Sequence, residues 1–122
     1  MNGNLFTYLA AFIRIIDGDT YEVEVDLGFH IKTKMKIRLR GVNTPELKGN
    51  DKLNGLKAKN FVTEIFFTGP GSKLDAIIRT HKTDKYGRYV ADVQLLSGSD
   101  LATLLLNEGL AVKVDYEYRT PA

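Results

Sequence analysis

Three short segments of the chain combine residue types that could act together on a phosphodiester. Residues 16–20 place two carboxylates on an Asp-Gly-Asp turn that leads into a strand. Residues 38–46 end a strand on arginine and then present an amide, a hydroxyl and a carboxylate. Residues 82–88 form a charged turn that ends on Arg88. Taken singly, each segment is also typical of an ordinary surface turn, because Asp and Gly favour turns and surface Arg and Glu are common.

Taken together, the segments supply what phosphodiester cleavage requires. The Glu46 carboxylate could accept a proton from an attacking water as general base. The guanidinium groups of Arg38 and Arg88 could hold phosphate oxygens and offset the charge that grows in the transition state. A divalent cation held by oxygen ligands could orient the water and neutralise charge.

Composition restricts the metal chemistry that this chain can perform. The 122 residues include no cysteine and only two histidines, which excludes disulfides, thiol catalysis and cysteine-based metal sites within the chain. A bound metal would therefore be held by oxygen, as calcium and magnesium are. The net charge of +2 is too small to name a partner.

Two alternating segments, residues 20–27 and 31–40, predict an antiparallel hairpin. If Asp26 faces Lys32, the same register sets Glu24 against Lys34 and Glu22 against Lys36 on a solvated face. We expect these lysines to form half of an ion-paired ladder rather than a track for DNA. The acids end before the bases do, so Arg38 is left opposite Thr20 and beside the Asp-Gly-Asp turn.

The rest of the chain completes a mostly β domain. Residues 41–55 are loop-like, and a helical period follows over residues 56–67. Two strands are predicted at residues 74–80 and 88–95. A second short helix, capped by Ser99 or Asp100, is predicted at residues 99–108, and a last strand at residues 110–114. This order favours an α+β, mostly β fold, namely a five-stranded Greek-key barrel of the OB type with two to three helices. We expect residues 1–122 to form one domain.

These motifs, in this order and at this spacing, resemble the staphylococcal nuclease family from about Ile13 to Tyr118. The resemblance implies an OB barrel with helices and calcium-dependent hydrolysis of DNA and RNA that leaves 3′-phosphate ends. It implies a calcium ligand at Asp19 and a second one at the backbone carbonyl of Thr44.

The resemblance also assigns the other roles in the site. It makes Glu46 the general base, and Arg38 and Arg88 the phosphate-binding arginines. It assigns a nucleotide pocket to four more residues, which are Lys85, Tyr86, Tyr116 and Tyr118.

The chain departs from the family pattern in two places. Asn43 stands where the best-known member carries a second calcium-ligating aspartate, so we expect Asn43 to ligate calcium through its amide oxygen and more weakly. We also expect the family's usual C-terminal helix to be absent, because the sequence reaches Ala122 first, and this leaves a short member of the family or a shortened chain open. In addition, strict alternation puts Asp19 and Arg38 on opposite faces, whereas the implied site needs both side chains. We therefore expect a bulge or strong twist near residues 17–20.

The favoured function is a calcium-dependent endonuclease of low sequence specificity that acts on single-stranded or flexible DNA and RNA. The alternative is an OB-fold nucleic-acid-binding module that is catalytically weak or inactive. We expect a monomer with no membrane partner and no obligate protein partner. The N-terminal residues do not form a signal peptide, which leaves a cytoplasmic protein or the mature form of a secreted one open.

Overall fold

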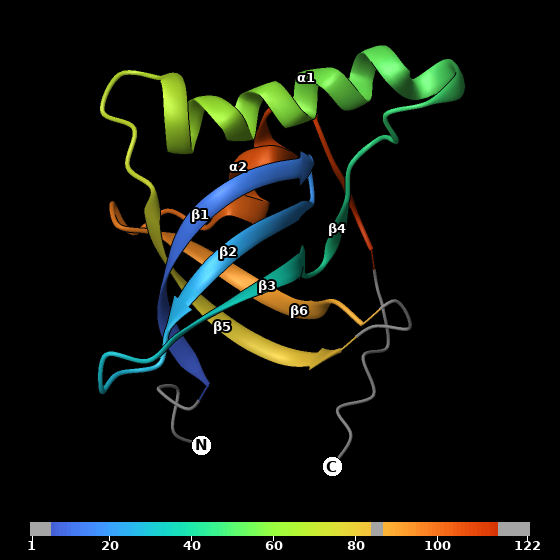
Figure 1. Cartoon of the computed structure of the whole chain (residues 1–122). Helices are drawn as coiled ribbons and strands as arrows, with labels where there is room; N and C mark the ends of the chain where they lie inside the picture. The colour runs from blue at the N-terminus through green and yellow to red at the C-terminus, as the bar shows by residue number, and fades with distance from the viewer. Residues whose placement is uncertain (1–5, 84–86, 115–122) are drawn as a thin grey trace.

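The computed structural model describes residues 6–83 and 87–114, and within these ranges five strands close into a barrel in the order β1-β2-β3-β6-β5 (Figure 1). These strands are β1 (Thr7–Asp17), β2 (Thr20–Asp26), β3 (Lys32–Leu39), β5 (Asp75–Thr83) and β6 (Tyr89–Leu95). Neighbouring strands are antiparallel except β3 and β6, which run parallel. The predicted mostly β, OB-type fold is therefore confirmed.

The β2–β3 hairpin has the register that its charge pattern predicts. Asp26 pairs with Lys32, and Thr20 pairs with Arg38 at the other end of the hairpin. The apolar residues between the acids of β2 are fully buried, which fixes the register because a slip of one residue would turn them to solvent. The outer face of the hairpin thus carries the charged residues, and the inner face fills the barrel.

The expected irregularity near residues 17–20 is also present. The β1–β2 ladder shifts register between Phe12 and Arg14 and again between Ile15 and Asp17. Asp17 then pairs with Thr20, so that Gly18 and Asp19 form the tip of a tight turn. The second shift lets Asp19 turn toward the end of β3 instead of following the inward side chains of β2.

The main helix begins earlier than its hydrophobic period predicts. A short 3₁₀ turn, η1 (Gly49–Asp51), leads into α1 (Lys52–Thr63), which continues as a π-helical turn, η2 (Glu64–Thr68). The Asn-Gly pair at residues 54–55 predicts a loop but lies inside α1. Gly55 is needed there because a β-carbon at this position would lie 2.4 Å from the backbone oxygen of Glu46. Close packing of helix on backbone thus overrides the local preference for a turn.

Both helices cover open parts of the barrel (Figure 1). The η2 residue Phe66 stacks on Phe12 of β1 with ring centroids 3.9 Å apart. The second helix, α2 (Leu101–Asn107), is capped by Asp100, as predicted, since the Asp100 carboxylate accepts from the Thr103 amide. None of the helices in the described ranges has the length and apolar character that crossing a bilayer requires.

A short second sheet extends from the end of β3. It pairs β4 (Val42–Asn43) with β7 (Val112–Lys113), inside segments predicted as a loop and as a longer strand. β4 follows β3 directly through Gly41, whose φ of +84° suits a glycine. Because of this turn, the residues after β3 fold back beside its last side chains.

We expect Gly55→Ala to lower the free energy of unfolding by about 1–3 kcal/mol, because the added methyl group must displace the Glu46 backbone. Alanine inside an ordinary helix would instead stabilise the protein by up to about 1 kcal/mol. Urea unfolding followed by circular dichroism measures the difference. Asn54→Ala, at an exposed position of the same helix, is the matched control and should not destabilise the fold.

Candidate active site

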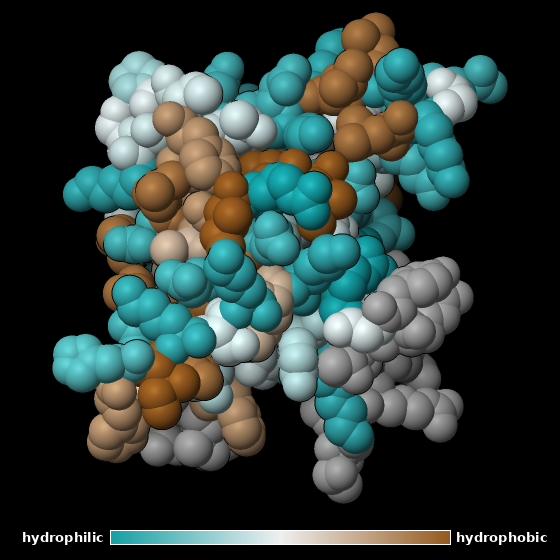
Figure 2. Space-filling view, viewed as in Figure 1, coloured by the Kyte–Doolittle hydropathy of each residue, from teal (hydrophilic) through white to brown (hydrophobic). Residues whose placement is uncertain are grey.

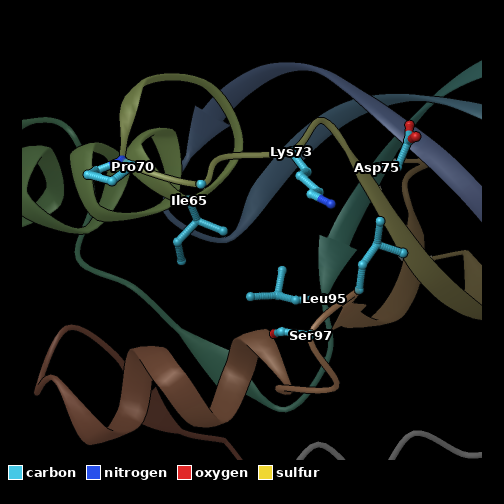
Figure 3. Close-up of a pocket in the computed structure, with 8 residues that line it drawn as sticks. Ile65, Pro70, Lys73, Asp75, Leu95 and Ser97 are labelled. Carbon is cyan, nitrogen blue, oxygen red and sulfur yellow. The ribbon is translucent and has the colours of Figure 1, made fainter.

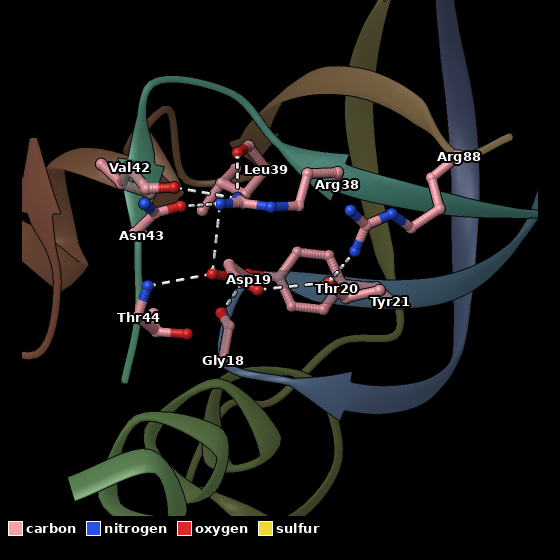
Figure 4. Close-up of polar contacts among 10 residues, drawn as sticks. All are labelled: Gly18, Asp19, Thr20, Tyr21, Arg38, Leu39, Val42, Asn43, Thr44 and Arg88. Carbon is pink, nitrogen blue, oxygen red and sulfur yellow. Dashed lines mark hydrogen bonds and ion pairs between the residues drawn. The ribbon is translucent and has the colours of Figure 1, made fainter. Parts of the chain in front are cut away.

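Three segments that are distant in the sequence meet at one side of the barrel (Figure 4). They are the β1–β2 turn with Asp19, the end of β3 with its continuation into β4, and Arg88 just before β6. The structure therefore brings Arg38, Asn43 and Thr44 to the same place as Asp19.

The Arg38 guanidinium is the centre of this site. Its Nη1 donates to the backbone oxygens of Leu39 at 2.7 Å and Val42 at 2.8 Å. Its Nη2 donates to the Asn43 side-chain oxygen and lies 3.4 Å from Oδ2 of Asp19. Arg38 is only 9% exposed, so these contacts compensate a nearly buried charge. Both terminal nitrogens face protein oxygens, in contrast to the open phosphate fork that the sequence suggests.

Asp19 joins the turn to the segment after β3. It is 8% exposed, and its Oδ2 accepts from the Thr44 amide at 2.9 Å. Its Oδ1 accepts from the Thr20 hydroxyl at 3.2 Å. The Thr20 hydroxyl oxygen in turn accepts from Nη1 of Arg88 at 3.3 Å. Thr20, which sequence motifs mark only as the end of a turn, thus links the carboxylate to the second arginine.

A buried tyrosine holds the turn in place. The Tyr21 hydroxyl donates to the Gly18 backbone oxygen at 2.6 Å, and the ring is completely buried. Burial is the main cause that raises the pKa of Tyr21 well above its ordinary value, so the hydroxyl stays protonated and can donate. Gly18 itself admits no side chain, because a β-carbon would lie 2.7 Å from Ala58 and 2.9 Å from Thr44. Alternation in the sequence marks Tyr21 only as a core residue.

Further charges face the same corner of the molecule. Burial is the largest cause that raises the pKa of Asp17, and the charge of Asp19 is the second. The Glu46 carboxylate acts in the same direction, whereas Lys59 and Arg88 lower the pKa. Glu46, two residues beyond Thr44, is exposed to solvent. Lys59 of α1 was not foreseen, because nothing in the sequence sets it apart from the other lysines of that helix.

The donor chemistry of this corner fits a hard cation. The Asp17 and Asp19 carboxylates repel one another, which a bound cation would relieve, and oxygen is the ligand that calcium prefers. Thr44 adds a buried hydroxyl oxygen that finds no hydrogen-bond partner among the described residues. In the described part of the chain, however, no three His, Cys, Asp or Glu side chains form a preassembled metal site. The Asn43 oxygen is also already engaged by Arg38.

The remaining predicted residues lie outside the described ranges. These are the four residues assigned to a nucleotide pocket, Lys85, Tyr86, Tyr116 and Tyr118. Their placement relative to Arg88 therefore stays a prediction.

A separate hollow of about 420 Å³ lies away from this site (Figure 3). It is lined by η2, the loop that leads into β5, and the end of β6 with the residues after it, including Ile65, Lys73 and Leu95. Arg88 precedes the opposite end of β6. The hollow thus belongs to another part of the barrel and adds nothing to the site.

The chain was compared with known protein families. Residues 36–121 match the family described as staphylococcal nuclease homologue. The matched range contains the predicted residues from Arg38 onward, whereas the turn with Asp19 precedes it. A search of curated proteins finds no match to the chain.

We expect Tyr21→Phe to lower the free energy of unfolding by about 1–3 kcal/mol, because the buried Gly18 oxygen loses its hydrogen bond. Chemical denaturation measures this loss. Tyr8→Phe, which removes the same group from a half-buried residue of β1, is the control. Equal effects of the two changes would contradict a specific role of the Gly18 contact.

Proposed function

This chain belongs to the staphylococcal nuclease family, and we propose that it is a calcium-dependent endonuclease that hydrolyses DNA and RNA with little sequence specificity. The proposed products carry 3′-phosphate ends, and the proposed substrates are single-stranded or flexible strands. One observation carries the proposal. A single hydrogen-bonded network joins Arg38, Asp19, Thr20 and Arg88, which come from three different segments.

In the proposed reaction, water attacks phosphorus and the bond from phosphorus to the 5′ oxygen breaks. The leaving 5′ oxygen takes a proton from solvent and departs as a hydroxyl. Glu46 takes the proton of the attacking water, and its exposure leaves it accessible to a water beside the substrate. Arg88 offsets the negative charge that grows on the phosphate oxygens. Arg38 contributes its buried charge and its Nε–H, since both of its terminal nitrogens are directed at protein oxygens.

We propose that Asp19 and the Thr44 carbonyl hold the calcium ion, with Asp17 as a further carboxylate beside them. Calcium held there would supply positive charge that polarises the phosphate and makes water easier to deprotonate. Asn43 serves as a weak ligand, because its oxygen is shared with Arg38 and carries no net charge. Lys85, Tyr86, Tyr116 and Tyr118 are proposed to hold the nucleotide, since tyrosine rings stack on any base.

The second candidate is a nucleic-acid-binding module with weak or no catalysis. The arrangement of Arg38 favours it, because a guanidinium that binds four protein oxygens has one N–H donor left for phosphate. The neutral side chain of Asn43 also favours this alternative, because it adds no negative charge to a calcium site. Under this alternative the chain binds strands without cutting them.

Digestion of single-stranded DNA separates the two candidates. We expect cleavage with calcium, none with EDTA, and a rate about 100- to 10,000-fold lower for Glu46→Gln, because the general base is lost. Glu108→Gln, an exposed change beyond α2, is the control and should retain full activity. Unchanged cleavage in EDTA or by Glu46→Gln would refute the mechanism. Retained binding of the strand without any cleavage would show that the chain is a nucleic-acid-binding module.

We expect Asn43→Asp to tighten calcium binding roughly ten-fold, because calcium affinity rises with the charge of the ligands. Isothermal titration calorimetry on the metal-free protein measures this directly. Asn107→Asp adds the same charge at an exposed position of α2 and should leave the affinity as it is. An unchanged affinity of Asn43→Asp would exclude residue 43 as a ligand.

A further inference from the structure

The tip of the β2–β3 hairpin is built from residues that do not suit its backbone. The Ile31 amide donates to the Gly28 oxygen at 2.9 Å, which closes a two-residue turn over Phe29 and His30. Both turn residues have positive φ, 56° and 61°. Such turns favour Asn-Gly, because a side chain at positive φ is strained. Nothing in the folding of the hairpin explains a phenylalanine here.

The side chains of this tip are exposed as well as strained. Phe29 is 93% exposed, and its apolar neighbours Leu27 and Ile31 are 43% and 55% exposed. Figure 2, viewed as Figure 1, shows a hydrophobic group at the lower left, where the hairpin ends, with hydrophilic residues directly above it. A strained residue that buries nothing within its own chain is expected to contact another molecule.

A row of basic residues connects this tip with the site. Lys32, Lys34, Lys36 and Arg38 occupy alternate positions of β3 and therefore share its outer face. The row covers about 20 Å, with successive side chains about 6.7 Å apart. This spacing resembles that of successive phosphates in an extended single strand. Arg38 at one end already belongs to the proposed active site.

In the part of the chain that the structure describes, the opposing acids do not form the ion pairs with this row that the sequence predicts. Glu22 forms an ion pair with Arg14 of β1, at 3.8 Å. Asp26 accepts from the Gly28 amide at 2.8 Å. Within residues 6–83 and 87–114, Lys32, Lys34 and Lys36 form no ion pair, although they face the acids in register. The expected ladder of ion pairs is therefore wrong, and the lysines remain available to phosphates.

We propose that the outer face of β3, from Arg38 to the tip at Phe29, holds an extended single strand of DNA or RNA. Each of the four basic residues contacts one phosphate, and Phe29 stacks on a base beyond Lys32. This proposal rests on the proposed function, whose substrate it defines as a strand of at least five nucleotides. Four to five nucleotides lie at the lower end of the site sizes of OB folds.

Binding measured in EDTA tests the proposal independently of catalysis. Fluorescence anisotropy with labelled strands of two and ten nucleotides gives the dependence of affinity on length. We expect the wild type to bind the longer strand far more tightly. Lys34→Ala should lower the slope of log K against log salt by about 0.7, the value for one phosphate contact with a single strand. Lys73→Ala, beside the distant hollow, is the control and should leave the slope unchanged.

The double variant Phe29→Asn, His30→Gly tests the tip. It should unfold at higher temperature, because Asn-Gly relieves the strain, and bind the ten-nucleotide strand roughly ten-fold more weakly, because one stack is lost. Loss of affinity in a more stable protein cannot come from misfolding. Equal affinity for the long strand in the wild type and both variants would overturn the proposal.

Two further outcomes are distinguishable. If Glu46-dependent cleavage occurs but its KM does not depend on strand length, the proposed binding face on β3 is wrong and the proposed nuclease function is retained. If the variants weaken binding but no strand is cleaved under any condition, the binding face on β3 is supported and the proposed nuclease function is wrong. Sedimentation with phosphatidylserine and phosphatidylcholine vesicles completes the test, because loss of vesicle binding with intact strand affinity would assign the tip to a membrane instead.

Discussion

The buried charge of Arg38 is the constraint on which the site depends. A guanidinium removed from water is costly unless its donors find oxygens in good geometry. Here the chain turns back through Gly41 so that Leu39, Val42 and Asn43 can supply those oxygens. The same turn brings the Thr44 amide to Asp19, whose carboxylate completes the set of partners. The arginine thus organises the backbone around it as well as carrying charge.

Close backbone contacts connect this network to the main helix. Gly55 lets α1 approach the backbone of Glu46, and Gly18 fits beneath Thr44 and Ala58. These two positions leave no room for a β-carbon, so the helix, the turn and the segment after β4 are in close contact. The position of the proposed general base therefore depends on how well α1 packs. Changes in that packing, far from any substrate, would alter the site.

The hairpin connects two regions with different chemistry. At one end, Thr20 and Arg38 pair within the charged network, where side chains are buried and their partners are specific. At the other end, Phe29 is exposed on a strained turn and has no such role in the fold. One strand face joins these ends, since residues two apart on a strand point the same way. Recognition of a strand along β3 and chemistry at Arg38 would then share one surface.

Several features of the fold follow from local patterns. The register from Thr20 to Asp26 against β3 was predictable, because burial of one face and charge on the other leave one pairing. A helix cap at Ser99 or Asp100 was predictable from local sequence, and Asp100 provides it. The bulge before Asp17 was predictable only on the assumption that Asp19 and Arg38 reach one site. The start of α1 was not, because the contact that makes Gly55 helical comes from a separate segment. The long first strand β1 also has no clear alternation to reveal it.

In the site, too, some features follow from the sequence and others depend on contacts between separate segments. Residue types and their order determined which side chains could act on a phosphodiester, since that chemistry belongs to the carboxylates and guanidiniums themselves. Only the tertiary structure decided that Tyr21 holds the Gly18 turn, that Lys59 faces Asp17, and that Arg38 directs its terminal nitrogens at the protein. It also decided that Arg14, rather than Lys36, pairs with Glu22. The physical reason is that hydrogen bonds and ion pairs depend on distances of a few ångströms between segments far apart in the chain, which no local pattern encodes.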